Sequence, residues 1–252
     1  MSDLDLIKKE VAQANRLIAE MGLATGPTAE RGHVSLRLPD DPGKFLIKGL
    51  GPALSQTKAD HMVVCDMEGF KVSGPPEINL PNEVKMHSCL LRANPNIQSV
   101  VHVHPRYTVL MSVLQANLGP MCIEGLPLFK IPLPVFPSPR LIIREEDGVE
   151  VASMLGASEA ILLQGHGAAT VGADMEDAVM NMLHLEEQAR MNYWAYCAAG
   201  PSHPTLSADQ VEEFVSNMRT MSGQKHLAPE VAPTPRKPGG VWNHYAAIAG
   251  NE

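Results

Sequence analysis

Several features that define whole classes of proteins are missing from this sequence of 252 residues. It contains no run of about 18 apolar residues, which a membrane-spanning helix requires, and no charged and then apolar segment after Met1 that would direct secretion. Internal repeats and low-complexity segments are also missing. These absences favour a cytoplasmic protein that has no membrane partner.

Positive charge is in deficit as well. The sequence has 20 lysine and arginine residues against 28 aspartate and glutamate residues, so its net charge is −8 and its pI is near 5.7. Non-specific binding to nucleic acids or to anionic membranes requires basic patches on the surface. We therefore expect no nucleic-acid partner.

Cysteine is scarce, and its spacing is irregular. The four cysteines lie far apart in largely apolar stretches, at Cys65, Cys89, Cys122 and Cys197. A disulfide framework or a zinc knuckle would need closely spaced cysteines. We expect these residues to be reduced and to pack in the core.

The length and the apolar content of 44% suit one domain with a single core. Apolar residues three or four apart predict helices, and short β-branched runs between turn residues predict strands. The expected strands cover residues 31–37, 45–48, 61–65, 70–72, 98–104 and 160–164, and the expected helices cover residues 3–21, 82–93, 105–115, 174–199 and 207–221. Because the strands cluster early, the expected fold class is α/β, in an α+β-like arrangement, with a central and mainly antiparallel sheet covered by helices.

The ends of the expected elements carry recognisable signals. Asp174 and Ser207 are placed as N-caps of the last two helices, and Gln210 is placed to complete a capping box with Ser207. The stretch over residues 120–139 is rich in proline and predicts extended connections. Residues 223–252 contain four prolines and two adjacent glycines, so we expect an irregular tail after a domain that ends at residue 222.

The strand expected at residues 98–104 carries two histidines, His102 and His104, and is followed by Pro105. Side chains alternate between the two faces of a strand, so these two imidazoles point the same way. Two imidazoles in this arrangement can bind one metal ion, with bonds of about 2 Å. We therefore interpret His102 and His104 as metal ligands.

Two further residues complete a candidate metal site. His166 lies between Gly165 and Gly167 directly after an expected strand, and the glycines allow a sharp turn and a close approach. Glu83 lies in the first turn of an expected helix, where the helix dipole favours an acidic residue whatever its function. Three histidines and one carboxylate suit zinc, manganese, iron or cobalt, and we expect one such divalent ion per subunit.

Glu83, the His102-Val-His104 strand and the later Leu-Leu-Gln-Gly-His166-Gly together resemble the class II aldolase/adducin family. The family includes fuculose-phosphate aldolase and ribulose-phosphate epimerase, and the resemblance covers most of the chain. It implies that residues 1–222 form the catalytic domain and that the three histidines hold a catalytic divalent metal. It also implies that Glu83 is a metal ligand, a proton-transfer group or both in turn.

The sequence departs from the sugar-phosphate members of this family in two places. Those members bind phosphate through a Gly-Asn turn and through a pair of small hydroxyl residues before the carboxylate. Here Gly32-His33 stands at the first place, and Leu80-Pro81-Asn82 precedes Glu83. A proline offers neither an N–H group nor a hydroxyl, so an anion site built from those donors is weakened. A substrate other than a phosphorylated sugar is therefore favoured.

The pattern Gly-His33-x-Ser35, together with His-Val-His-Pro-Arg106-Tyr107, resembles the family's decarboxylases of hydroxylated aromatic dicarboxylates, such as a dihydroxyphthalate or a pyridine dicarboxylate. The resemblance implies a metal-dependent carbon–carbon lyase whose small-molecule substrate contacts His33, Ser35, Arg106 and Tyr107. An arginine can hold a carboxylate through two parallel N–H bonds, which suits such a substrate.

Other interpretations of the same residues stay open. The family also contains aldolases and epimerases of sugars and sugar phosphates, and adducin uses the fold as a non-catalytic binding module. A binding module has no need of three histidines and a carboxylate in register, so we expect an enzyme. A surface or structural role remains open for His33, Lys48 and Arg106, and it is the expectation for His184 and His203.

Family members are usually homotetramers with active sites at subunit boundaries, where a C-terminal aromatic residue reaches a neighbouring subunit. The resemblance implies the same assembly here, and the tail offers Trp242 and Tyr245 for that contact. We therefore name Tyr245 as a second catalytic candidate beside Glu83. A tail without defined structure is the alternative interpretation.

Overall fold

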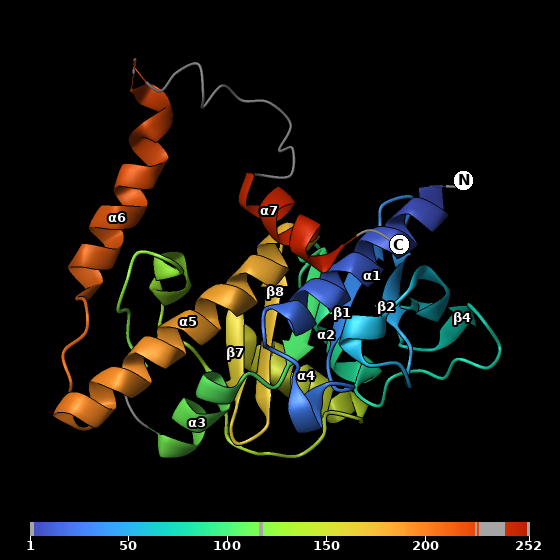
Figure 1. The fold of residues 1–252 in the computed structure, drawn as a ribbon, viewed down its shortest axis with the longest axis horizontal. Coiled ribbons are helices and arrows are strands. Elements are labelled where there is room, and N and C mark those ends of the chain that lie inside the picture. The colour runs from blue at the N-terminus through green and yellow to red at the C-terminus, as the bar shows by residue number, and fades with distance from the viewer. Residues whose placement is uncertain (1–2, 116–117, 225, 227–239, 251–252) are drawn as a thin grey trace.

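The computed structural model describes residues 3–115, 118–224, 226 and 240–250. Within these residues, eight strands form one sheet in the order β4-β3-β2-β1-β5-β8-β7-β6 (Figure 1). Neighbouring strands are antiparallel except for β6 and β7, which run parallel. The strands are β1 His33–Leu38, β2 Asp41–Lys48, β3 Met62–Asp66, β4 Lys71–Ser73, β5 Ser99–Val103, β6 Val135–Phe136, β7 Ala160–Leu163 and β8 Gly167–Gly172. The mainly antiparallel sheet expected from the sequence is confirmed.

Helices cover both faces of this sheet. Helices α1, α5 and α7 lie on one face and α2 and α4 on the other, while α6 stands to one side (Figure 1). The helices are α1 Asp3–Glu20, α2 Val84–Ala93, α3 Arg106–Leu114, α4 Glu145–Leu155, α5 Met175–Ala199, α6 Ala208–Thr220 and α7 Gly240–Ala249, with short 3-10 helices η1 Gly26–Thr28, η2 Leu54–Gln56, η3 Ala59–His61, η4 Leu126–Phe129 and η5 Met221–Gly223. None of the helices described here has the length and apolar composition needed to cross a membrane.

The sheet separates two layers of buried apolar side chains. Phe45, Leu90 and Phe136 are fully buried in the layer that contains α2 and α4. Leu17 and Met182 are buried in the layer beneath α1 and α5. Burial of one large apolar side chain contributes about 1.5–3 kcal/mol to stability, so both layers hold the helices against the sheet.

The helix starts that the sequence signals predicted are confirmed. The Asp174 carboxylate accepts a hydrogen bond from the Asp177 N–H at 2.8 Å, which caps the start of α5. Ser207 and Gln210 form the reciprocal capping box at the start of α6. In both cases a side-chain oxygen satisfies an N–H group that has no partner within the helix.

Helix α4 and strand β8 were not expected from the sequence. Gly148 lies inside α4, where glycine is normally unfavourable, but a Cβ at this position would lie 2.7 Å from Cys89 Sγ and 2.9 Å from the Lys85 carbonyl oxygen. The glycine is therefore what allows α4 to pack closely on α2. Strand β8 begins with Gly167, Ala168 and Ala169, which have little strand preference, and β5 and β7 pair with its two edges.

The expectation of an irregular tail is wrong for its last part, because residues 240–249 form helix α7. Side chains of α1 hold this helix by its carboxyl end: Gln13 donates from Nε2 to the Ala246 carbonyl at 3.0 Å, and Arg16 donates from Nε to the Ala249 carbonyl at 3.2 Å. Trp242 is only 8% exposed and packs in the layer beneath α1 and α5. Residues 227–239 lie outside the described residues.

A buried polar network joins α5 to the loop that follows α3. The fully buried Asn192 side chain accepts from the Gly119 N–H at 3.1 Å and donates to the Gly119 carbonyl at 2.8 Å. His203 Nε2 donates to the same Asn192 oxygen at 3.0 Å. The structural role expected for His203 is therefore the one it has.

This network predicts the effect of Asn192→Leu. The substitution leaves buried groups of Gly119 and His203 without partners, and each such group costs about 1–3 kcal/mol. We expect the free energy of unfolding, measured by urea titration, to fall by about 3 kcal/mol. Asn217→Leu is the matched control, because Asn217 is exposed on α6 and its replacement should change stability by less than about 0.5 kcal/mol. Equal effects of the two substitutions would contradict the role of the network.

Candidate metal centre

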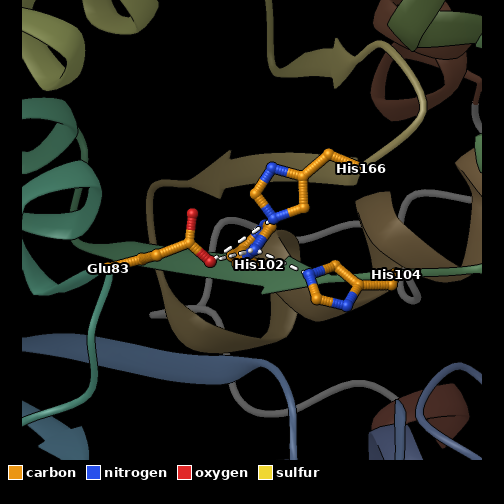
Figure 2. A group of neighbouring side chains, drawn as sticks. All are labelled: Glu83, His102, His104 and His166. Atoms are coloured by element: carbon orange, nitrogen blue, oxygen red, sulfur yellow. Dashed lines mark hydrogen bonds and ion pairs between the residues drawn. The ribbon is translucent and has the colours of Figure 1, made fainter. Parts of the chain in front are cut away.

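Four polar side chains from three separate parts of the chain meet at the end of β5. His102 belongs to β5 and His104 follows it, Glu83 directly precedes α2, and His166 lies in the turn between β7 and β8 (Figure 2). One ligand atom from each residue lies within 4.8 Å of the others. The structure thus gathers into one cluster the four residues that the sequence nominated as metal ligands.

The turn that carries His166 depends on its glycines. Gly165 has φ +69°, a left-handed conformation that glycine adopts without strain. A Cβ on Gly167 would lie 2.4 Å from the Val103 carbonyl oxygen and 2.7 Å from His104 Cδ2. Only glycine therefore lets this turn approach β5 closely enough for His166 to face the other two imidazoles.

Glu83 is aimed at the imidazoles and is held there by a backbone amide. Its Oε2 lies 3.3 Å from His102 Nε2 and 3.4 Å from His166 Nε2, while its Oε1 accepts from the Ile142 N–H at 2.9 Å. Glu83 occupies the N-cap position of α2, yet its side chain caps no helical amide. Favourable interaction with the helix dipole therefore does not account for where this carboxylate points.

The electrostatics of the cluster keep its ligand atoms available. Burial would raise the pKa of the Glu83 carboxyl, but the His102 and His166 imidazoles outweigh burial and hold this pKa well below its ordinary value. Burial lowers the pKa of His104 to about 3, so this imidazole is neutral and has a free lone pair. A carboxylate and neutral imidazoles are the forms in which these side chains bind metal.

The hydrogen bonds of the imidazoles fit a divalent cation. His102 donates from Nδ1 to the Ala168 carbonyl at 2.9 Å, which leaves the lone pair of its Nε2 facing the cluster. His104 Nε2 lies 3.2 Å from this His102 Nε2, and His166 Nδ1 is buried without a hydrogen-bond partner among the described residues, while His166 Nε2 faces the Glu83 carboxylate. Convergent lone pairs of this kind repel one another unless a cation lies between them, so the donor set suits a metal with mixed nitrogen and oxygen ligands.

A second group of polar residues lies on the same face of the sheet. His33 pairs with His102 across the ladder between β1 and β5, and Ser35 follows on the same side. Ser35 Oγ lies 2.8 Å from Nδ1 of the fully buried His87, whose ring is 5.8 Å from that of His33 in an edge-on arrangement. Sequence reasoning missed His87, although its place one helical turn after Glu83 puts both on one face of α2.

The remaining predicted contacts lie elsewhere. Arg106, Tyr107 and Tyr245 line a cavity of about 660 Å³ between α3, α5 and α7, and none of the four cluster residues lines it. Glu186 of α5 forms part of this cavity and accepts from the Tyr107 N–H at 3.0 Å. The structure therefore groups Arg106 and Tyr107 with Tyr245 of the same chain, and His33 and Ser35 with His87.

Lys48 and His184 both lie outside the metal cluster. Lys48 is fully buried, its Nζ donates to the Gly49 carbonyl at 3.2 Å, and burial lowers its pKa to about 8. His184 lines the same cavity as Arg106, and a Cβ on Gly125 would lie 2.7 Å from its Cβ. Neither side chain belongs to the four-residue cluster.

A family model for the class II aldolase and adducin N-terminal domain matches residues 9–193, which include the whole cluster. The chain belongs to the class II aldolase and adducin family. The family assignment made from the histidine motifs is therefore confirmed.

Members of the class II aldolase family with assigned activities resemble this chain over most of its length. It is 31% identical over 211 residues to 3,4-dihydroxyphthalate decarboxylase of Terrabacter sp. (strain DBF63), covering 80% of this chain and 85% of that protein. It is 29% identical over 198 residues to 3-oxo-tetronate 4-phosphate decarboxylase of Haemophilus influenzae, covering 74% of this chain and 87% of that protein. Among solved structures, L-fuculose 1-phosphate aldolase from Glaciozyma antarctica PI12 has a TM-score of 0.74 at 20% identity, covering 86% of this chain and 82% of that one.

The cluster predicts that the purified protein binds one divalent ion per subunit and that His102→Ala loses it. Because no other side chain in the described cluster can replace His102, the affinity should fall on the order of 100-fold or more. Elemental analysis after dialysis against a weak chelator measures the difference. His61→Ala removes a histidine of η3, outside the cluster, and should keep the full metal content. Equal metal content in His102→Ala and the unmodified protein would contradict the assignment of His102 as a metal ligand.

Proposed function

We propose that this protein is a divalent-metal-dependent carboxy-lyase that releases CO2 from a hydroxylated aromatic dicarboxylic acid, such as a dihydroxyphthalate or a hydroxypyridine dicarboxylate. The observation that carries the proposal is the convergence of three imidazoles and the Glu83 carboxylate in one cluster, in which Glu83 and His102 are buried and His104 and His166 are partly exposed. The similarity to a dihydroxyphthalate decarboxylase supports decarboxylation as the reaction and an aromatic acid as the substrate. We expect the enzyme to be a cytoplasmic homotetramer, in line with the family resemblance.

His102, His104 and His166 would hold the metal ion, with Glu83 as a fourth ligand or as an adjacent proton-transfer group. A divalent ion at this place supplies a Lewis acid that withdraws electron density from a substrate oxygen while a carbon–carbon bond breaks. The histidines contribute by keeping nitrogen ligands in fixed positions. The Ala168 carbonyl keeps His102 in the orientation that presents Nε2.

The position of Glu83 supports a role in proton transfer. One carboxylate oxygen is anchored by the Ile142 amide, and the other faces His102 and His166. In the proposed reaction, a water molecule held by the Glu83 carboxylate delivers a proton to the ring carbon that bears the substrate carboxylate, either directly or through Glu83 after Glu83 has taken that proton from the water. The bond from that carbon to the carboxylate then breaks, CO2 leaves, and the bonding electrons return to the ring.

His33 and Ser35 are the proposed substrate contacts nearest to the cluster. His33 pairs with His102 across the ladder, and its buried Nδ1 has no hydrogen-bond partner among the described residues. A neutral imidazole here offers one donor and one acceptor to a ring hydroxyl or a carboxylate. Arg106 and Tyr107 line a cavity of their own with Tyr245, and their proposed role is to bind the part of the substrate farthest from the metal. Tyr245 stays the second catalytic candidate, proposed to act at the active site of a neighbouring subunit.

The second candidate function is an aldolase or epimerase of a sugar or sugar phosphate. The likeness to the fold of a fuculose-phosphate aldolase favours it. Aldol cleavage and decarboxylation both leave an electron pair on carbon next to an oxygen, so one metal site suits either reaction. The residues before Glu83 weigh against phosphate: Pro81 has no N–H, and His33 replaces the asparagine of the phosphate turn. A non-catalytic adducin-like module remains a remote alternative.

The deciding experiment measures CO2 release by the metal-loaded protein from a panel of hydroxylated aromatic acids, and turnover of sugar phosphates by the same preparation. We expect CO2 from at least one aromatic dicarboxylate and no competition by sugar phosphates at about millimolar concentration, since a substrate charge left without its partner costs several kcal/mol. Turnover of fuculose or ribulose phosphates, with no CO2 from any aromatic acid, would reverse the order of the two candidates.

Glu83→Gln tests the proposed proton transfer. The amide keeps the shape of the side chain and one oxygen for the Ile142 N–H, but it neither carries a negative charge nor transfers a proton. We expect kcat to fall on the order of 100-fold or more while the melting temperature stays close to that of the unmodified protein. Near-normal kcat in a fully metal-loaded Glu83→Gln protein would assign Glu83 a structural role.

A further inference from the structure

The segment that connects β6 to α4 contacts the Glu83 carboxylate of the metal centre through Ile142. The Ile142 side chain is fully buried, and its N–H donates to Glu83 Oε1 at 2.9 Å. Its neighbours point outward, since Leu141 is 46% exposed and Ile143 is 52% exposed. The direction of the Glu83 carboxylate therefore depends on how well this one turn of backbone is held in place.

Two arginines on either side of Ile142 bind one carboxylate. Arg144 donates to Asp147 from Nε at 2.8 Å and from Nη2 at 3.0 Å, in a two-pronged contact. Arg140 approaches the same carboxylate from the other end of the segment, with its Nε 2.9 Å from Asp147 Oδ1. Asp147 thus ties both ends of residues 140–144 to the first turn of α4.

The burial of these groups shows which one is central. The Asp147 side chain is only 4% exposed, whereas those of Arg140 and Arg144 are 41% and 66% exposed. Arg144 and then Arg140 hold the pKa of the Asp147 carboxyl below its ordinary value, so the group is a carboxylate when it binds them. A buried carboxylate that binds two guanidinium groups fixes the positions of both groups, whereas an exposed ion pair fixes neither partner firmly.

The ordinary explanation of an acidic residue at this place does not cover these contacts. Three acidic residues, Glu145, Glu146 and Asp147, lie in the first turn of α4, where any of them interacts favourably with the helix dipole. Of the three, Asp147 alone is buried, and it is the one that both arginines bind. An acidic residue in this turn stabilises the helix through its charge alone. Neither the burial of Asp147 nor its contacts with both arginines are needed for that effect.

We propose that Asp147 is a positioning residue for Glu83: by binding Arg140 and Arg144 it fixes the Ile142 amide, and that amide orients the Glu83 carboxylate within the metal centre. Among the described residues, Asp147 has no contact with the four cluster residues, so its proposed effect on Glu83 passes through the Ile142 backbone hydrogen bond. Loss of its charge weakens the hold on both ends of the segment, and a displacement of about 1 Å is enough to lose a hydrogen bond of 2.9 Å.

The test is a double-mutant cycle read out by cobalt binding. Asp147→Asn keeps the shape of the side chain and removes its charge; it is made in the otherwise unmodified full-length protein and in Glu83→Gln. The dissociation constant of Co²⁺ is measured by competition with a chromophoric chelator, together with the visible absorption of the bound ion. We expect about 10-fold weaker binding and an altered absorption band in the first background, because loss of an outer partner of a metal site costs 10–100-fold in affinity. We expect no further loss in Glu83→Gln, where the carboxylate that Asp147 positions has been removed.

Two further variants make the result specific. Glu150→Gln removes a carboxylate of α4 that also pairs with Arg140 but is 51% exposed and does not bind Arg144, and it should leave Co²⁺ binding unchanged. Arg144→Gln removes the two-pronged contact at an exposed position, so it should fold even if Asp147→Asn does not, and it should weaken binding in the same direction. Unchanged Co²⁺ binding in Asp147→Asn or Arg144→Gln, or an equal loss in both backgrounds of the cycle, would overturn the inference.

An activity readout extends the cycle and rests on the proposed function. If the protein releases CO2 from an aromatic dicarboxylate, Asp147→Asn should lower kcat with little change in KM, and Glu83→Gln should suppress this effect too. If no aromatic acid is turned over by the unmodified protein, the proposed function fails while the cobalt cycle still decides the role of Asp147. The two failures are therefore distinguishable.

Discussion

The antiparallel pairing of β5 with β1 on one side and β8 on the other is the constraint on which the site depends. It sets His102 opposite His33 and Ala169 and places all three on one face of the sheet. Side chains in a strand alternate, so a shift of one residue would turn His102 and His104 into the opposite layer and bring Val103 into the site. The buried side chains on both faces exclude such a shift, and the register of the core therefore also fixes the geometry of the metal centre.

The sequence was most informative where local chemistry decides local structure. The strand that carries His102 and His104, the cap at Asp174 and the capping box at Ser207 depend on neighbouring residues, and all three were predictable. Helix α4 and strand β8 were not, because their stability comes from partners far along the chain: Gly148 packs on α2, and β8 lies between two other strands. A single sequence carries no signal for contacts of that kind.

The candidate site divides in the same way. Its ligands could be nominated because histidine, glycine and carboxylate patterns reflect coordination chemistry directly. The residues that orient the ligands were not recognised: His87 could have been found by its helical spacing from Glu83, whereas the Ile142 amide carries no side-chain signal. Arg106 and Tyr107 follow His104 in sequence, yet α3 turns them into a cavity shared with Tyr245. Their contact with a substrate stays a prediction, because the start of a helix redirects successive side chains and closeness in sequence alone does not fix what they face.

The docking of α7 on α1 has a consequence for how the chain is made. Gln13 and Arg16 emerge from the ribosome early, but the carbonyl groups that they bind lie 233 residues later, at Ala246 and Ala249. During synthesis, the surface of α1 that receives Trp242 stays uncovered until the residues of α7 have been translated. Native contacts between such distant parts of a chain form slowly, so this apolar surface of the nascent protein is exposed to aggregation until α7 is released. Helix α7 thus closes a surface that has been open since α1 emerged.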